Sequence, residues 1–204
     1  MKLGNIKIQS LSLIYPDWSV EYDEGNLDDV IFGLKSNPNF SSYLSASVGA
    51  INRAFSIIEE SFLSPKGIKT IPSTNIQNRF GGTVFSLDDD IFKVCTVLIN
   101  GTEVDFELIT KKLIKVALIN SSDSVEVIYL QKINRINHET GSGYEVDLGG
   151  IEEFIPYFVK SELSGQDSEE GKNALKIFED ILDKYSGIFE SEGFVKTVYS
   201  IRRI

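Results

Sequence analysis

The segment at 151–185, IEEFIPYFVKSELSGQDSEEGKNALKIFEDILDKY, carries the pattern from which the rest of the fold is predicted. Its apolar residues recur at spacings of three and four, which is the period of one face of an α-helix. Gly165 is predicted to end a first helix, and Asp167 with Glu170 has the spacing of a capping box for a second. The two apolar stripes are Ile151, Phe154, Ile155, Phe158 and Leu163, then Ala174, Ile177, Phe178, Ile181, Leu182 and Tyr185.

The same period occurs twice before residue 65. Residues 26–36 predict a short amphipathic helix with Asn26 as its N-cap. Pro38 suits the first position of a longer helix, because its missing N–H costs nothing there, and Asn37 would be the cap. The stripe of this longer helix is Phe40, Leu44, Val48, Ile51, Phe55, Ile58 and Phe62. Residues 5–13 instead alternate roughly between polar and apolar, which predicts a short strand or extended arm.

Short runs rich in β-branched and aromatic residues fill the middle of the chain. Residues 66–78 predict a connection with one short strand at 68–71. Asn100-Gly101 predicts a two-residue hairpin turn, since this pair readily takes the positive φ values that such a turn needs. Polar clusters predict further turns at 121–124 and 138–144. The expected strands are 83–87, 92–99, 102–108, 113–118 and 125–130.

These patterns predict an α+β fold, in which a helical bundle is built from N- and C-terminal segments and an antiparallel β-sheet subdomain is inserted between them. The expected boundaries are 1–65 and 151–190 for the bundle and 66–150 for the insert. A C-terminal arm is expected at 191–204.

Composition excludes several classes of function. A net charge of −10 and a pI near 4.7 disfavour sequence-independent binding to phosphates. Cys95 is the only cysteine and lies in an apolar run, so we expect a buried, inert thiol and neither a disulfide nor a thiolate metal site. The polar N-terminal residues predict no signal peptide, and no apolar run has the length of a membrane span. We therefore expect a protein of the cytoplasm with no membrane partner.

Common catalytic groups lack their usual partners. His138 is the sole histidine and lies in a polar loop, so a solvated loop side chain is the simpler interpretation. Gly81-Gly82 and residues 141–143 are predicted to be turns, because neither is followed by the Lys-Ser/Thr pair of a phosphate-binding loop. A turn is also favoured for Asp88, Asp89 and Asp90, which lack the spacing of a calcium loop.

One acidic row leaves an enzymatic alternative open. On a single strand at 102–108, the residues Glu103, Asp105 and Glu107 would share one face, with Val104, Phe106 and Leu108 on the other. Such carboxylates could hold metal ions in a hydrolase. The lysine expected two residues after an acid in metal-dependent nucleases is missing here, so we favour a solvated face. We predict no catalytic residue, no metal site and no cofactor.

The C-terminal half resembles the head-to-tail adaptor (connector) proteins of tailed bacteriophages. In that family an I-P-Y helix start is followed by an x-E-L stretch, a polar turn around an aspartate and an alanine-led helix. Ile155, Pro156, Tyr157, Glu162, Leu163, Asp167 and Ala174 hold those places. Residues 27–66 resemble the family's first helices, and the order of helices, strands and helices also matches. Residues 66–150 carry no matching motif.

The resemblance implies a structural virion protein and not an enzyme. Copies would be assembled in the host cytoplasm into a closed ring, commonly of about twelve subunits in that family. At the neck of the virion this homo-oligomer would contact the portal protein and tail proteins and extend the channel for double-stranded DNA. An acidic lumen would let the phosphates slide without sticking.

The tail is too apolar to remain alone in water, and we expect it to be a partner-docking arm. Its residues are Phe194, Val198, Tyr199, Ile201, Arg202, Arg203 and Ile204. The same feature supports a further alternative, a cytoplasmic regulatory module that binds a partner through this tail.

Overall fold

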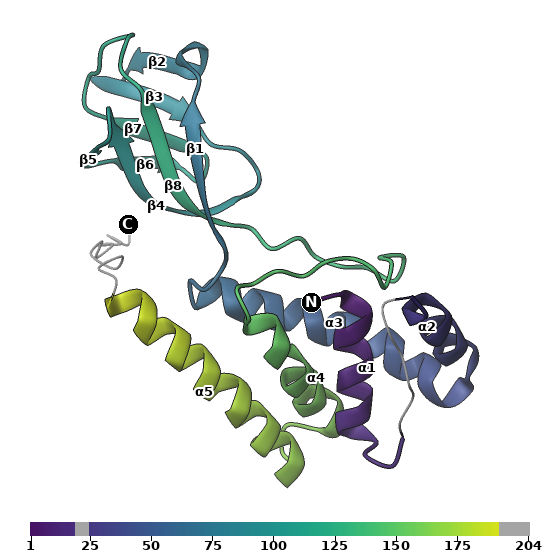
Figure 1. Ribbon diagram of the computed structural model, residues 1–204. Coiled ribbons are helices and arrows are strands. Elements are labelled where there is room, and N and C mark those ends of the chain that lie inside the picture. Colours follow the sequence, from purple (N-terminus) through teal and green to yellow (C-terminus); the bar gives the residue numbers. More distant parts are fainter. Residues whose placement is uncertain (19–24, 192–204) are drawn as a thin grey trace. The chain divides into compact units, whose positions relative to one another are not determined.

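A computed structural model describes residues 1–18 and 25–191 of the chain. Within those residues the protein is α+β, with five α-helices and two antiparallel four-stranded sheets (Figure 1). Two compact units are formed. The helical unit comprises Met1–Leu63 with Asn134–Ile188, and the β unit contains Ser64–Ile133. No helix in the described part of the chain has the length and apolar character needed to cross a membrane.

The helical unit is organised around α4 (Ile155–Ser164), which packs against α1 (Leu3–Ile14) and α3 (Pro38–Glu60). A short 3₁₀ turn, η2 (Ile151–Phe154), leads into α4, while α2 (Leu27–Ser36) packs on α3. α5 (Glu169–Ser191) is joined to α4 by the ring contact of Phe158 with Phe178, at 5.1 Å between centroids. Fully buried side chains of the unit include Leu3, Ile6, Leu11, Ile51, Phe55, Ile58, Ile155 and Phe178.

The predicted strand or arm at 5–13 is wrong, because this segment lies within helix α1. Leu3, Ile6, Ile8 and Leu11 are all buried, and so are Lys7 and Ser10 between them. A helix that is covered on most of its faces has no single apolar stripe, so its period is hidden in the sequence. The alternation at 5–13 therefore reflects apolar residues on several sides of a helix and not the two faces of a strand.

The other predicted helices are confirmed. α2 follows Asn26 at the N-cap position, although the Asn26 side chain makes no capping hydrogen bond, and α3 begins at Pro38. Gly165, with φ of 87°, ends α4. The capping residue of α5 is Ser168 and not Asp167: its Oγ accepts a hydrogen bond from the Gly171 N–H at 2.9 Å.

The β unit consists of two sheets around one apolar core (Figure 1). One sheet has the order β1-β8-β4-β5, and the other β2-β3-β7-β6. Their strands are β1 (Lys66–Ile71), β2 (Ile76–Arg79), β3 (Gly82–Ser86), β4 (Ile91–Ile99), β5 (Thr102–Val104), β6 (Glu107–Thr110), β7 (Leu113–Val116) and β8 (Val125–Gln131). Both sheets contribute to the core, which includes Ile71, Phe85, Val97, Ile114, Val116, Val125 and Val127.

The hairpin predicted at Asn100-Gly101 is confirmed. The two residues have φ of 52° and 78° and connect the paired ends of β4 and β5. A second two-residue turn, at Phe80-Gly81, joins β2 to β3 with φ of 55° and 71°. The sequence did not predict this hairpin, because phenylalanine is an unusual residue at positive φ and because β2 is a polar, mostly exposed edge strand.

The single strand predicted at 102–108 is wrong. β5 pairs with β4 in one sheet, whereas β6 pairs with β7 in the other. The chain crosses between the sheets at residues 105–106, where the partly buried Phe106 packs against the common core. Packing of this aromatic ring against the core shared by the two sheets stabilises the break in the strand.

Residues 134–150, which were predicted as part of the insert, cluster with the helical unit. Their polar backbone is paired there. Asn52 on α3 donates to the Ile136 carbonyl at 2.8 Å and accepts from the Ile136 N–H at 2.9 Å. The Val146 N–H donates to the Met1 carbonyl at 2.8 Å. Such contacts between distant segments leave no periodic signal in the sequence.

Candidate functional site

A groove lies at one end of the β unit. It has a volume of about 650 Å³ and is formed by the turn before β4, the first residues of β4 and the turn between β6 and β7. Its lining residues are Leu87, Asp88, Asp89, Ile91, Phe92, Lys93, Val94, Leu108, Lys111, Lys112 and Lys132.

Strand pairing brings these turns together. β3 and β7 pair up to Ser86 and Leu113, and beyond that pair the Leu87 N–H donates to the Lys112 carbonyl at 2.7 Å. The Lys132 N–H donates to the Asp90 carbonyl at 2.7 Å on the other side of the same turn. The groove walls are thus fixed by backbone hydrogen bonds, which makes the surface pre-organised for a partner.

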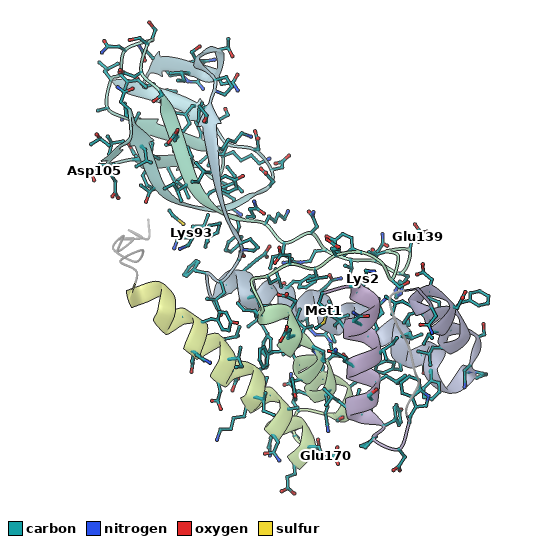
Figure 2. The ribbon with its side chains drawn as sticks, in the orientation of Figure 1. Met1, Lys2, Lys93, Asp105, Glu139 and Glu170 are labelled. Carbon is teal, nitrogen blue, oxygen red and sulfur yellow. The ribbon has the colours of Figure 1, made fainter. Side chains whose placement is uncertain are left out.

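The charges at the groove are mainly positive. Asp88 pairs with Lys69 and Asp89 pairs with Lys112, so two of the aspartates are offset by lysines. Lys93, Lys111 and Lys132 add three further cations to the lining. Figure 2 shows Lys93 at this end of the β unit. Because the ion pairs are exposed to solvent, each contributes only about 0–1 kcal/mol to stability.

The floor of the groove is apolar and partly open to water. Phe92 is 39% exposed and Leu108 is 41% exposed, while Val94 and Leu87, which also line the groove, are buried. Lysines around an accessible aromatic and aliphatic floor suit a protein surface that carries both carboxylates and apolar groups.

The acidic row predicted at 102–108 is not formed, because Glu103 and Glu107 belong to different sheets. Asp105 lies at the crossing between them, on the surface of the β unit (Figure 2). Glu107 is 3.4 Å from the Lys115 ammonium, an ion pair across β6 and β7. Within residues 1–18 and 25–191, no three His, Cys, Asp or Glu side chains are arranged to hold a metal ion. The hydrolase alternative therefore loses the strand face on which it was based.

The other predicted loop residues occupy turns. His138 is exposed in a turn at residues 138–139, which Asn137 and Thr140 close by side-chain hydrogen bonds of 2.9–3.0 Å. Gly81 lies in the β2–β3 turn at φ of 71°. Asp89 and Asp90 form the turn before β4. The solvated loop position of His138 is confirmed, whereas the two predicted turns are confirmed in part, because Gly82 already belongs to β3 and Asp88 precedes the turn.

Cys95 lies on β4 and is half-buried. Burial raises the pKa of its thiol, the nearby ammonium groups of Lys93 and Lys66 opposing that shift. A raised pKa keeps the sulfur protonated at neutral pH, and the protonated form is a poor nucleophile. The raised pKa agrees with the predicted low reactivity, whereas the predicted full burial is wrong because Cys95 is only half-buried.

The predicted docking arm, Phe194 to Ile204, lies outside the described residues. The groove, in contrast, was not predicted from the sequence. Its only local signal is the Lys111-Lys112 pair in a turn, and the sheet order is needed to bring Lys93 and Lys132 to the same place.

Comparison of the chain with protein-family models and with curated proteins finds no match.

Proposed function

We propose that this protein is a structural virion adaptor, which forms an oligomeric ring between the portal of a tailed bacteriophage and its tail and extends the DNA channel. The proposal includes the finer architecture, a helical bundle built from the two ends of the chain with the β subdomain inserted between them in the sequence. The adaptor would act by binding neighbours and would need no cofactor.

The observation that carries the proposal is the position of the motif at the start of α4. The resemblance to adaptor proteins depends on Ile155, Pro156 and Tyr157, which form the first turn of this helix. Ile155 and Pro156 are buried where α4 packs against α1 and α3. A proline is tolerated in the first helical turn, so the motif can fix where α4 begins without breaking it. The residues that resemble the family are therefore central to the bundle.

The distribution of charge supports a ring. Residues 64–133 contain eight basic and eight acidic residues, whereas the rest of the chain contains twelve basic and 22 acidic ones and so carries the whole net charge of −10. A ring is generated when one face of each copy binds a different face of the next. The lysine-lined groove and an acidic helical surface are two such unlike, complementary faces.

α5 offers a suitable acidic surface. Its apolar stripe faces inward at Ala174, Phe178 and Leu182. Its exposed face carries Glu169, Glu170, Glu179, Asp180 and Asp183. The exposed Ile177 adds an apolar group beside these carboxylates. We infer that the groove of one subunit receives this face of a neighbouring subunit.

The test is assembly with the portal protein of a tailed bacteriophage whose genome encodes this chain. The purified chain and portal are mixed and examined by light scattering and electron microscopy, and a closed ring attached to the portal is expected. Persistent monomers that do not bind the portal would contradict the adaptor function and leave the regulatory module as the better hypothesis.

Charge-reversal variants test whether the groove, and not another part of the surface, forms the contact between subunits. The triple variant Lys111→Glu, Lys112→Glu, Lys132→Glu is expected to abolish ring formation. The comparison variant Lys172→Glu, Lys176→Glu, Lys184→Glu reverses three charges at exposed positions of α5, the proposed partner face. Rings are expected to survive in it, because this face only becomes more acidic. Rings formed equally well by both variants would rule out the groove as the subunit contact.

Deletion of residues 194–204 tests the predicted arm. We expect assembly to be lost while the circular dichroism and thermal unfolding of the chain stay unchanged, because the arm would become ordered only on a partner. Unchanged assembly of the truncated chain would exclude this role.

A further inference from the structure

The sheet β1-β8-β4-β5 has one face in the core of the β unit and a second face on the opposite side (Figure 1). Cross-strand rows belong to the two faces in alternation, because successive side chains of a strand point to opposite sides. Ile71 pairs with Val125 in one row on the core side. The next core row pairs Val97 with Val127. The rows between them form the outer face, which includes Lys66, Ile68, Thr96, Glu103, Glu126 and Ile128.

Charges of opposite sign lie at the two ends of the outer face. Lys66 on β1 and Lys93 on β4 occupy one row, since both pair with the same residue of β8. Further along the strands, Glu126 of β8 and Glu103 of β5 both pair with Leu98 of β4. The cationic and the acidic row are separated by about 13 Å, the length of four residues of a strand. The outer face therefore has a cationic end and an acidic end.

The row between these ends is apolar and open to water. Ile68 is 70% exposed and pairs with the partly buried Ile128. The solvent face of an antiparallel sheet usually carries polar side chains, and β1 is moreover an edge strand, where an exposed apolar residue favours association. An apolar centre with a charged rim is the usual composition of a protein–protein contact surface.

The arrangement of the three rows is complementary to itself. A second copy can be placed face to face with the first and turned by 180° about an axis along the apolar row. The acidic row of each copy then lies over the cationic row of the other. Lys66 faces Glu126 of the second copy, and Lys93 lies between Glu126 and Glu103. Ile68 meets the apolar row of the second copy, so the two surfaces match as in a closed two-fold dimer.

We propose that the outer face binds the same face of a second copy of the chain, in a two-fold dimer with Ile68 and Ile128 at its centre and the lysine row of each copy against the acidic row of the other. Face-to-face packing of two sheets about 10 Å apart is common in proteins. The apolar centre supplies most of the association free energy, and the charged rows fix the orientation.

This contact goes beyond the proposed ring. The ring uses the groove and α5, which are unlike faces, whereas the dimer uses one face twice. Lys93 lines the groove as well and is therefore left unaltered in the test. Only a two-fold contact brings a residue beside its own copy, since a head-to-tail ring joins different surfaces. Cross-linking between identical positions thus distinguishes the two contacts.

The first test is cross-linking through Thr96, which lies in the apolar row on β4 and meets its own copy in the proposed dimer. Thr96→Cys is introduced into the full chain together with Cys95→Ser, so that one thiol remains, and a short bismaleimide is added. Covalent dimers are expected, with a yield that rises with protein concentration. Leu118→Cys in the same background is the control, because Leu118 is 68% exposed and lies between β7 and β8, outside the strands.

A substitution at the apolar centre measures its contribution. In the Thr96→Cys chain, Ile68→Asp should raise the protein concentration needed for half-maximal cross-linking at least about tenfold, because a carboxylate would be buried in the contact. Leu118→Asp is the matched control, since it makes the same change at an equally exposed position and should leave that concentration unchanged.

Exchange of two charges tests the orientation. Glu126→Lys should weaken the association about three- to tenfold, because the new ammonium group would face Lys66 of the other copy. Adding Lys66→Glu should recover part of this loss, since the two positions again carry opposite charges. Within one chain these positions are about 13 Å apart, so the recovery reports a pair between copies.

Three results would overturn the proposal. Cross-linking of Thr96→Cys that is no stronger than that of Leu118→Cys excludes the two-fold contact. Equal effects of Ile68→Asp and Leu118→Asp exclude the apolar centre; if Ile68→Asp does not fold, the charge exchange decides, and absence of recovery by Lys66→Glu excludes the orientation. Dimers that form only after deletion of residues 194–204 would assign the outer face to the chain's own C-terminal segment and not to a second copy.

Discussion

The helical unit and the β unit are held together in different ways. In the helical unit, segments far apart in the sequence meet through polar contacts: Arg135 binds Glu59 at 2.5 Å, and Asn52 forms two hydrogen bonds with Ile136. In the β unit, the pairs β2–β3, β4–β5 and β6–β7 join consecutive strands through short turns, while β1–β8, β4–β8 and β3–β7 bring together strands that are far apart in the sequence, and both sheets enclose an apolar core. The first unit therefore depends on specific polar pairs between segments, whereas the second depends on strand pairing, turns and apolar burial.

This difference suggests how one chain can supply two kinds of surface. The β unit is built from contiguous residues, and the strand pairs of its two sheets form within that segment. A partner can therefore bind its groove without a change in the helices. The residues outside the β unit carry the whole net negative charge. Changes that affect one unit should then leave the other intact, and this is what the following substitutions test.

Phe85→Ala is expected to have the largest effect. Phe85 on β3 is only 1% exposed and lies in the core shared by the two sheets, so its truncation should cost about 3–5 kcal/mol. Native-state hydrogen exchange should show faster exchange throughout the β unit, with protection in α1, α3 and α4 unchanged. The matched change Phe178→Ala in the helical unit should give the opposite pattern. Equal loss of protection in both units by either variant would show that they unfold as one.

The sequence predicted the parts of each unit that depend on local patterns. The Asn100-Gly101 turn needs positive φ at two adjacent residues, and the Ile155 to Phe158 stripe needs one buried helix face, so both were evident from residue types and spacing. Helix α1 was mistaken for a strand because it is covered on several sides. The strand at 102–108 was predicted as continuous because nothing in its alternation indicates that Phe106 crosses between two sheets.

The candidate sites were even less accessible from sequence. The groove combines Lys93, Lys111 and Lys132 from three separate parts of the β unit. Spacing along the chain could not show that these parts meet, because the order of the strands in the two sheets brings them together.

Arg135→Met should have the next largest effect and tests the long-range pairs of the helical unit. Glu59 is 5% exposed, and loss of the guanidinium removes a cationic partner from a buried carboxylate, with an expected cost of about 3 kcal/mol. The control is Arg53→Met on α3, the helix that also carries Glu59. The Arg53 side chain is 56% exposed and forms an ion pair with Glu162. Chemical denaturation should give a loss below about 1 kcal/mol for that variant. Similar losses for the two variants would mean that burial does not distinguish these ion pairs.

Gly101→Ala should have the smallest effect and tests how far the β unit depends on its local turns. Gly101 has φ of 78°, and a Cβ at this position would meet no atom within 4 Å. Any loss of stability would thus come from the backbone conformation alone, which costs an L-residue about 1–2 kcal/mol. Gly141→Ala is the control, because its surroundings are equally open and its φ is not in the left-handed region. Urea unfolding, followed by a probe in the β unit for Gly101→Ala and by a probe in the helical unit for Gly141→Ala, should detect the difference. If the two variants were equally stable, the β4–β5 turn would tolerate alanine at positive φ, and the register of β5 would have to depend on its contacts with β4.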